Sequence, residues 1–82
     1  MPKVVLTDGL ARKYTGGEKM LDIDAGNVRG IIKALDASFP GIGEALGAGI
    51  SVAIDGEIYQ DAFLETVGPD SEICFLPRIA GG

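Results

Sequence analysis

Residues 28–38 carry the strongest helical pattern in the chain and determine what the rest of the fold must provide. Apolar side chains recur there every three or four residues, so they form a stripe along one helix face. They are Val28, Ile31, Ile32, Leu35 and Phe39. Asn27 stands at a favoured N-cap position, and Pro40 disfavours helical geometry at the residue before it. Because a single apolar stripe must be buried against another layer, the chain needs a sheet for this helix to cover.

The other apolar segments are rich in β-branched residues or alternate with polar ones, and turns bound them, which favours strands. We predict strands at residues 3–7, 18–23, 50–54, 57–59 and 72–76, and a helical turn at residues 10–14 that Gly16 and Gly17 stop. Asp55-Gly56 indicates a hairpin, because both positions accept a positive φ. This order predicts an α+β roll, in which a mixed sheet of four to five strands packs on one main helix. Gly30 lies inside that helix at a cost of about 1 kcal/mol, and a close approach to the sheet is one reason for a glycine there.

The charge balance limits the classes of partner. Twelve Asp and Glu against seven Lys and Arg give 82 residues a net charge of -5. The polyanionic backbone of nucleic acid would repel such a chain, whereas a basic protein surface would attract it. The longest uncharged stretch in the middle of the chain, residues 45–54, is half the length of a spanning helix, which needs about 20 residues. We therefore expect no nucleic acid or membrane as partner, and a cytoplasmic location.

The chain contains little that could perform chemistry on its own. It has one cysteine and no histidine, which excludes an internal disulfide, a paired-cysteine redox motif and the commonest general base. We expect no enzyme activity of its own, no bound cofactor and no metal. The glycine run 41–47 lacks the dinucleotide spacing, since Leu46 stands where a glycine is needed, so we expect a connector with one helical turn around residues 44–46. Five acidic residues are expected to be solvated: Glu18, Asp22, Asp24, Asp61 and Glu65.

The last predicted strand has two different faces. Ile73 and Phe75 should point toward the helix, which leaves Cys74 and Leu76 on the opposite face. Val5 and Ile58 should join them there. An apolar set on the face without a helix is either covered by loops or a protein-binding patch. Cys74 is expected to behave as a small hydrophobe, because no basic residue beside it lowers its pKa.

Residues 78–82 extend beyond the last strand and end in Gly81-Gly82. Fully extended, they could span about 17 Å, and a tip without side chains can enter a narrow channel. The terminal carboxylate is a poor electrophile. Adenylylation by ATP would give it a leaving group, after which a sulfur or amine nucleophile could attack the Gly82 carbonyl. The simpler interpretation is a frayed terminus.

Several segments of the chain resemble the ubiquitin-like sulfur carriers of the MoaD and ThiS type, most of all the small subunit of molybdopterin synthase. The most specific is the ending Phe75-Leu76-Pro77-Arg78-Ile79-Ala80-Gly81-Gly82. The others are Val4-Val5-Leu6, Asn27-Val28, Ser38 to Ile42, Val52 to Glu57 and Ser71 to Cys74. The resemblance implies a β-grasp fold, with residues 1–77 as the domain and residues 78–82 as a flexible tail.

The same resemblance implies the roles of individual residues. Gly82 would be adenylylated with ATP by an activating enzyme and converted to a thiocarboxylate, and Gly81 would precede it in the inserted tail. Ile58 and Leu76 would contact partners on the open face, and Arg78, Ile79 and Ala80 would do so along the tail. In the molybdopterin case the sulfur goes to a cyclic pterin precursor, and two carriers assemble with two large catalytic subunits in a heterotetramer.

Other readings stay open at this point. Thr7 stands where some members carry an exposed aromatic residue, and Arg78 where many carry a second proline. These departures affect the partner surface and so the partner's identity. Relatives deliver sulfur in thiamine or cysteine synthesis. A protein modifier conjugated through Gly82 would use the same acyl adenylate, and a plain interaction module would use the sheet face alone.

Overall fold

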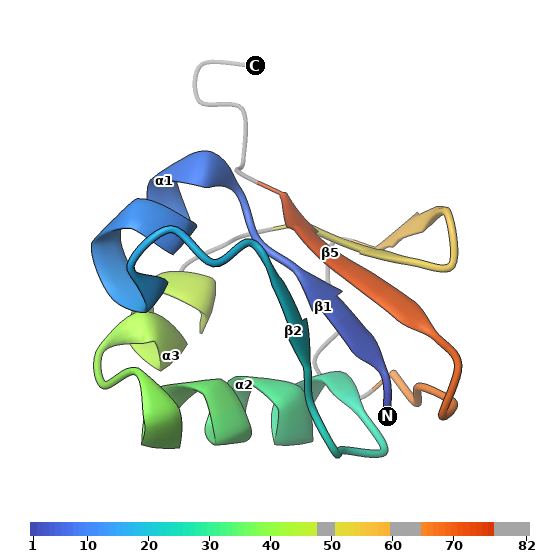
Figure 1. Cartoon of the computed structure of the whole chain (residues 1–82). Helices are drawn as coiled ribbons and strands as arrows, with labels where there is room; N and C mark the ends of the chain where they lie inside the picture. The colour runs from blue at the N-terminus through green and yellow to red at the C-terminus, as the bar shows by residue number, and fades with distance from the viewer. Residues whose placement is uncertain (48–50, 60–64, 77–82) are drawn as a thin grey trace.

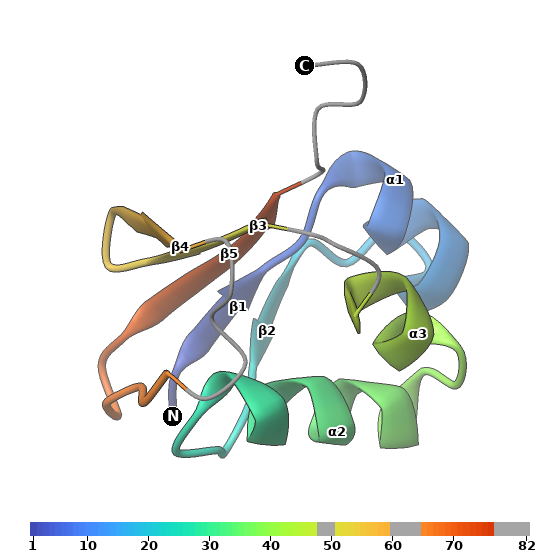
Figure 2. The same ribbon diagram turned by 180° about the vertical axis from the view of Figure 1, so that it is seen from behind.

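The computed structural model describes residues 1–47, 51–59 and 65–76. Its elements are β1 (Lys3–Val5), α1 (Asp8–Leu10), η1 (Ala11–Thr15), β2 (Met20–Asp22), α2 (Val28–Ser38), α3 (Ile42–Gly47), β3 (Ser51–Ile54), β4 (Glu57–Tyr59) and β5 (Glu72–Leu76). One mixed sheet runs in the order β2-β1-β5-β3-β4, with β1 and β5 parallel and the other neighbours antiparallel. Figures 1 and 2 show the helices on one side of it. The predicted α+β roll on one main helix is confirmed.

The core lies between α2 and the covered face of the sheet. Its largest fully buried side chains are Phe75, Ile31, Leu35, Ile42, Ile73, Val4 and Val28. The predicted alternation is confirmed on β1, where Val4 is buried and Val5 is half-buried, and on β5, where Ile73 and Phe75 are buried. These two parallel strands therefore bring adjacent buried side chains under the helix.

Helix α2 begins at the predicted cap. The Asn27 Oδ1 accepts a hydrogen bond from the Gly30 backbone N–H at 2.7 Å. A Cβ built on Gly30 would lie 3.1 Å from this Oδ1 and 3.2 Å from the Ala25 Cβ. The expected close approach of Gly30 to the sheet is therefore wrong, because the tight neighbours are the helix's own N-cap and the residue that leads into it.

Asn27→Ala is expected to lower the free energy of unfolding by about 1 kcal/mol, because the Gly30 N–H loses its acceptor. Asn27→Asp keeps an acceptor oxygen and should stay within a few tenths of a kcal/mol, about the spread among good caps. Urea unfolding followed by circular dichroism measures both. Equal losses in the two variants would contradict this role for the side chain.

The glycine run 41–47 is mainly helical, so the expected connector with a single turn is wrong. Ile42 and Leu46, four residues apart, are both buried on one face of α3, and this burial offsets the low helix propensity of the glycines. The exposed Asp36 caps the segment from outside, because its Oδ1 accepts the N–H groups of Gly41 at 3.1 Å and Gly43 at 3.0 Å.

Near the N-terminus, the boundaries of the strands and of the helical segment differ from the prediction. Thr7 was expected in the first strand, but its Oγ1 accepts the Leu10 N–H at 3.2 Å and caps α1. The helical segment therefore spans residues 8–15, and β2 is shorter than predicted. Gly16 and Gly17 end it with φ of 71° and 101°, as predicted. In the three described ranges, no helix has the length and apolar character to cross a membrane.

The hairpin between β3 and β4 turns at Asp55-Gly56, as predicted, with φ of 49° and 88°. Positive φ at both positions gives the turn that matches strand twist. Asp55 also holds the hairpin against β5. Its N–H donates to the Glu72 carbonyl at 3.0 Å, and its Oδ1 accepts the Glu72 N–H at 2.9 Å.

Candidate functional site

β5, the last element that the structure describes, lies in the middle of the sheet. β5 lies between β1 and β3, and its last residue, Leu76, pairs with Ser51 of β3. Buried Ile73 and Phe75 anchor the strand to the core. Leu76, the last described residue, is therefore held by the central strand of the sheet (Figure 1).

Five of the predicted site residues lie outside the described residues. They are Arg78, Ile79, Ala80, Gly81 and Gly82. Their roles, and the boundary between a domain at 1–77 and a tail at 78–82, stay predictions. The structure places the other two, Ile58 and Leu76, on the open face of the sheet: Ile58 is 67% exposed, and Leu76 is half-buried.

A row of apolar residues crosses the open face through all five strands. Strand register pairs each member with the next, because directly opposed residues share a face. The row, here called the apolar row, is Met20, Val5, Cys74, Ala53 and Ile58. Its two ends are exposed large hydrophobic side chains, with Met20 57% and Ile58 67% accessible.

The strand register confirms the predicted open-face set and extends it. Val5, Cys74, Leu76 and Ile58 were predicted for this face, but Met20 and Ala53 were not. The sequence held a signal for Met20, because this residue precedes Leu21 in the alternation of the second strand. Met20 and Ile58 stay exposed, so the described residues do not cover the ends of the row.

Cys74 occupies the middle of the apolar row. The residue is half-buried, and its Sγ lies 3.8 Å from the Glu72 Oε1. Burial raises the pKa of the thiol, and the negative charge and hydrogen bond of Glu72 raise it further. The thiol is therefore held in its unreactive protonated form, as the sequence predicted.

Alkylation of Cys74 by iodoacetamide should be slower at neutral pH than that of a free thiol, because a raised pKa lowers the thiolate fraction. Raising the pH through the thiol's pKa should restore the rate. Glu72→Gln removes the negative charge and should shift the pH profile of alkylation toward lower pH. A profile that does not move would contradict the assigned cause.

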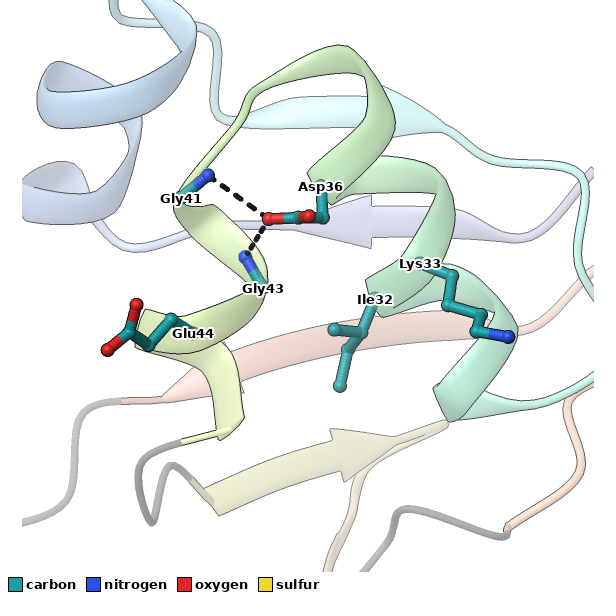
Figure 3. Close-up of a pocket in the computed structure, with 6 residues that line it drawn as sticks. All are labelled: Ile32, Lys33, Asp36, Gly41, Gly43 and Glu44. Carbon is teal, nitrogen blue, oxygen red and sulfur yellow. Dashed lines mark hydrogen bonds between the residues drawn. The ribbon is translucent and has the colours of Figure 1, made fainter.

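A second concave region lies between α2 and α3 (Figure 3) and is lined by Ile32, Lys33, Asp36, Gly41, Gly43 and Glu44. The Asp36 Oδ1 already accepts two backbone N–H groups there. The acidic residues predicted to be solvated are also placed: Glu18, Asp22 and Asp24 are exposed, Glu65 is half-buried, and Asp61 lies outside the described residues. Within the described ranges, no three His, Cys, Asp or Glu residues gather as a metal site would require.

Solved structures resemble this fold over its full length. A chain of the BexX/CysO complex from Amycolatopsis orientalis is 26% identical, with a TM-score of 0.86 and coverage of 100% of both chains. CysO of Mycobacterium tuberculosis is 18% identical, with a TM-score of 0.84, covering 96% of this chain and all of that one. Small archaeal modifier protein 1 from Methanosarcina acetivorans is 20% identical, with a TM-score of 0.80, covering 99% and 95%. The fold is the β-grasp that the sequence resemblance implied.

Sequence comparison assigns the family. No curated protein matches the chain. The ThiS family matches residues 8–82, which include β5, the tail and the terminal Gly81-Gly82. The match thus includes α2, β5 and the C-terminal residues. The chain belongs to the ThiS family of ubiquitin-like sulfur carriers.

Proposed function

We propose that this chain carries sulfur as a thiocarboxylate on Gly82. The observation that carries the proposal is the family match through residue 82, together with a central β5 that buried Ile73 and Phe75 anchor to the core. A sulfur carrier of this family is a substrate for enzymes and needs no catalytic side chains of its own, in agreement with a sequence that lacks histidine.

The proposed loading reaction consists of an adenylyl transfer, an acyl transfer and a reduction. An oxygen of the Gly82 carboxylate attacks the α-phosphate of ATP, and pyrophosphate leaves. The terminal sulfur of a persulfide on another protein then attacks the Gly82 carbonyl, and AMP leaves with the bonding electrons. A thiol then attacks the donor protein's sulfur in the resulting acyl disulfide, so that a new disulfide forms and the thiocarboxylate leaves. The activating enzyme supplies the ATP site.

The protein's own contribution is to present and orient the tail. The open face is proposed to dock on the activating enzyme and then on the acceptor enzyme, with Ile58 and Leu76 in contact. Both side chains have apolar surface to bury, which is what an interface core requires. Arg78, Ile79 and Ala80 would line the enzyme's channel, and Gly81 would pass its narrowest part.

The proposed acceptor is the cyclic pterin precursor of molybdopterin, because the chain's ending resembles the small subunit of molybdopterin synthase. The partner would then be the large catalytic subunit in a heterotetramer with two copies of each. Mixing the loaded chain with that subunit and the pterin precursor should yield the dithiolene product. Sulfur transfer to a different acceptor, as in thiamine or cysteine synthesis, would keep the carrier function and replace the pathway.

A second candidate is a protein modifier conjugated to lysines through Gly82. Its support is the likeness to small archaeal modifier protein 1 at a TM-score of 0.80. Covalent high-mass adducts in cells that disappear when Gly82 is deleted would favour the modifier. A chain found only free or as its thiocarboxylate would favour the carrier.

Intact-mass measurement tests the carrier function. Incubation with ATP, an activating enzyme and a persulfide donor should raise the mass by about 16 Da, because sulfur replaces one carboxylate oxygen. Omitting ATP is the control and should give no change. An unchanged mass with several activating enzymes of the family would overturn the proposal.

A further inference from the structure

A charged border runs beside the apolar row on the open face. Strand register pairs Lys3 of β1 with Asp22 on one side and with Glu72 on the other. Asp55 follows at the hairpin turn, where its Oδ1 accepts the Glu72 N–H. All four residues are exposed. The border therefore carries three carboxylates and one ammonium group at the end of the sheet where β1 and β5 begin, lower right in Figure 1.

On the other side of the apolar row, the strand positions of β1, β5 and β3 carry uncharged residues: Leu76 pairs with Ser51, and Thr7 follows β1. Beyond Thr7, Asp8 forms an ion pair with Lys19. Leu76, the last residue of β5, lies four positions after Glu72, which corresponds to about 13 Å in a strand. The open face thus has an acidic border at the start of β5, and its β1, β5 and β3 positions nearer the end of β5 are uncharged.

The border carboxylates form no ion pair within the described residues. Within residues 1–47, 51–59 and 65–76, the ion pair that the structure contains joins Lys19 to Asp8, and neither belongs to the border. Lys3 offsets one of the three negative charges without forming a direct ion pair in these ranges. A partner that covered the border with neutral or acidic groups would desolvate carboxylates without compensation, which is costly.

We infer that the partner surface that receives this face is an apolar strip bordered by Arg or Lys on the side away from the tail channel. The inference rests on the proposed function, because it names the chemistry of the enzyme surface that the carrier docks on. Complementary charge at an interface rim speeds association and fixes orientation more than it adds affinity. The border therefore sets the direction in which the tail points when the face docks.

The test compares two pairs of neutralising substitutions that change the net charge equally. Asp22→Asn with Glu72→Gln removes the border charge. The control pair, Glu44→Gln with Glu57→Gln, changes exposed residues away from the open face: Glu44 lies on α3, and Glu57 pairs with buried Ile54 on the covered side. The probe is the activating enzyme that loads the wild-type chain, and stopped flow measures the association rate.

The border pair should slow association at low salt by about tenfold, and the difference should shrink at high salt. Lys3→Gln should act in the opposite direction and speed association. The control pair should stay within about twofold of wild type. Equal slowing by both pairs, or no slowing by the border pair, would overturn the inference. Unfolding midpoints close to that of wild type should accompany all variants, because these side chains are exposed.

The outcome separates this inference from the proposed function. A wild-type chain that gains about 16 Da as thiocarboxylate while border variants associate normally would refute the inference alone. If no enzyme loads the chain, the carrier function fails, and a peptide of alternating Leu and Arg serves as the probe. It should shift the amide NMR signals of Val5, Ala53 and Cys74, whereas a Leu-Glu peptide should not. Equal shifts with both peptides would refute the inference.

Discussion

A chain that lacks Gly82 is expected to take up no sulfur and yet unfold at the same urea concentration as the intact chain. Loading needs the terminal carboxylate at the end of a tail of fixed length. Deleting one residue shortens the tail by about 3.3 to 3.6 Å, so the carboxylate no longer reaches the same position. The sheet and core that the structure describes are built from residues up to Leu76. Mass spectrometry reports the loading, and circular dichroism reports the unfolding.

Gly81→Ala tests the same region without changing the length of the tail. A Cβ at this position should slow loading by tenfold or more, about 1.4 kcal/mol, if the enzyme channel is narrow. The unfolding midpoint of Gly81→Ala should again equal that of wild type.

Normal loading of the chain that lacks Gly82 would show that sulfur is attached elsewhere and would contradict the assignment of Gly82 as the sulfur site.

Phe75→Ala is expected to remove a large part of the protein's stability. Phe75 is 1% exposed near the end of β5, where it pairs with Val52 and packs in the core. Truncating such a side chain costs about 3–5 kcal/mol. A domain of this size has about 4–12 kcal/mol in total, so the variant should be largely unfolded at modest urea concentrations.

The adjacent residue provides the matched control. Cys74 lies in the same strand but faces the open side and is half-buried. Cys74→Ala should therefore cost about 1 kcal/mol or less. Similar losses for both variants would mean that β5 does not present one face to the core and the other to solvent, contrary to the fold described above.

The main elements could be predicted because local pattern and tertiary environment agree in them. The stripe of α2 requires burial, and Asn27 supplies the cap that starts it. The bounds of β4 and β5 follow directly from the Asp55-Gly56 turn and from the alternation around Phe75. In each case the residues that form the element also determine which face is buried.

The elements that could not be predicted depend on contacts from distant residues. The helix α3 forms in a glycine run because Ile42 and Leu46 reach the core and Asp36 of α2 caps it. Thr7 leaves the predicted strand because it caps α1. The apolar row needs the strand register, which no single segment specifies, so Met20 could not be placed beside Val5 from the sequence.

The most direct test of the carrier function is to locate the added sulfur by fragmenting the loaded chain in a mass spectrometer. We predict a gain of about 16 Da confined to the fragment that ends in Gly82, because one carboxylate oxygen is replaced. A gain of about 32 Da on the fragment that contains Cys74 would instead indicate a persulfide on the thiol. That result, with an unmodified terminal glycine, would show that Gly82 does not carry the sulfur.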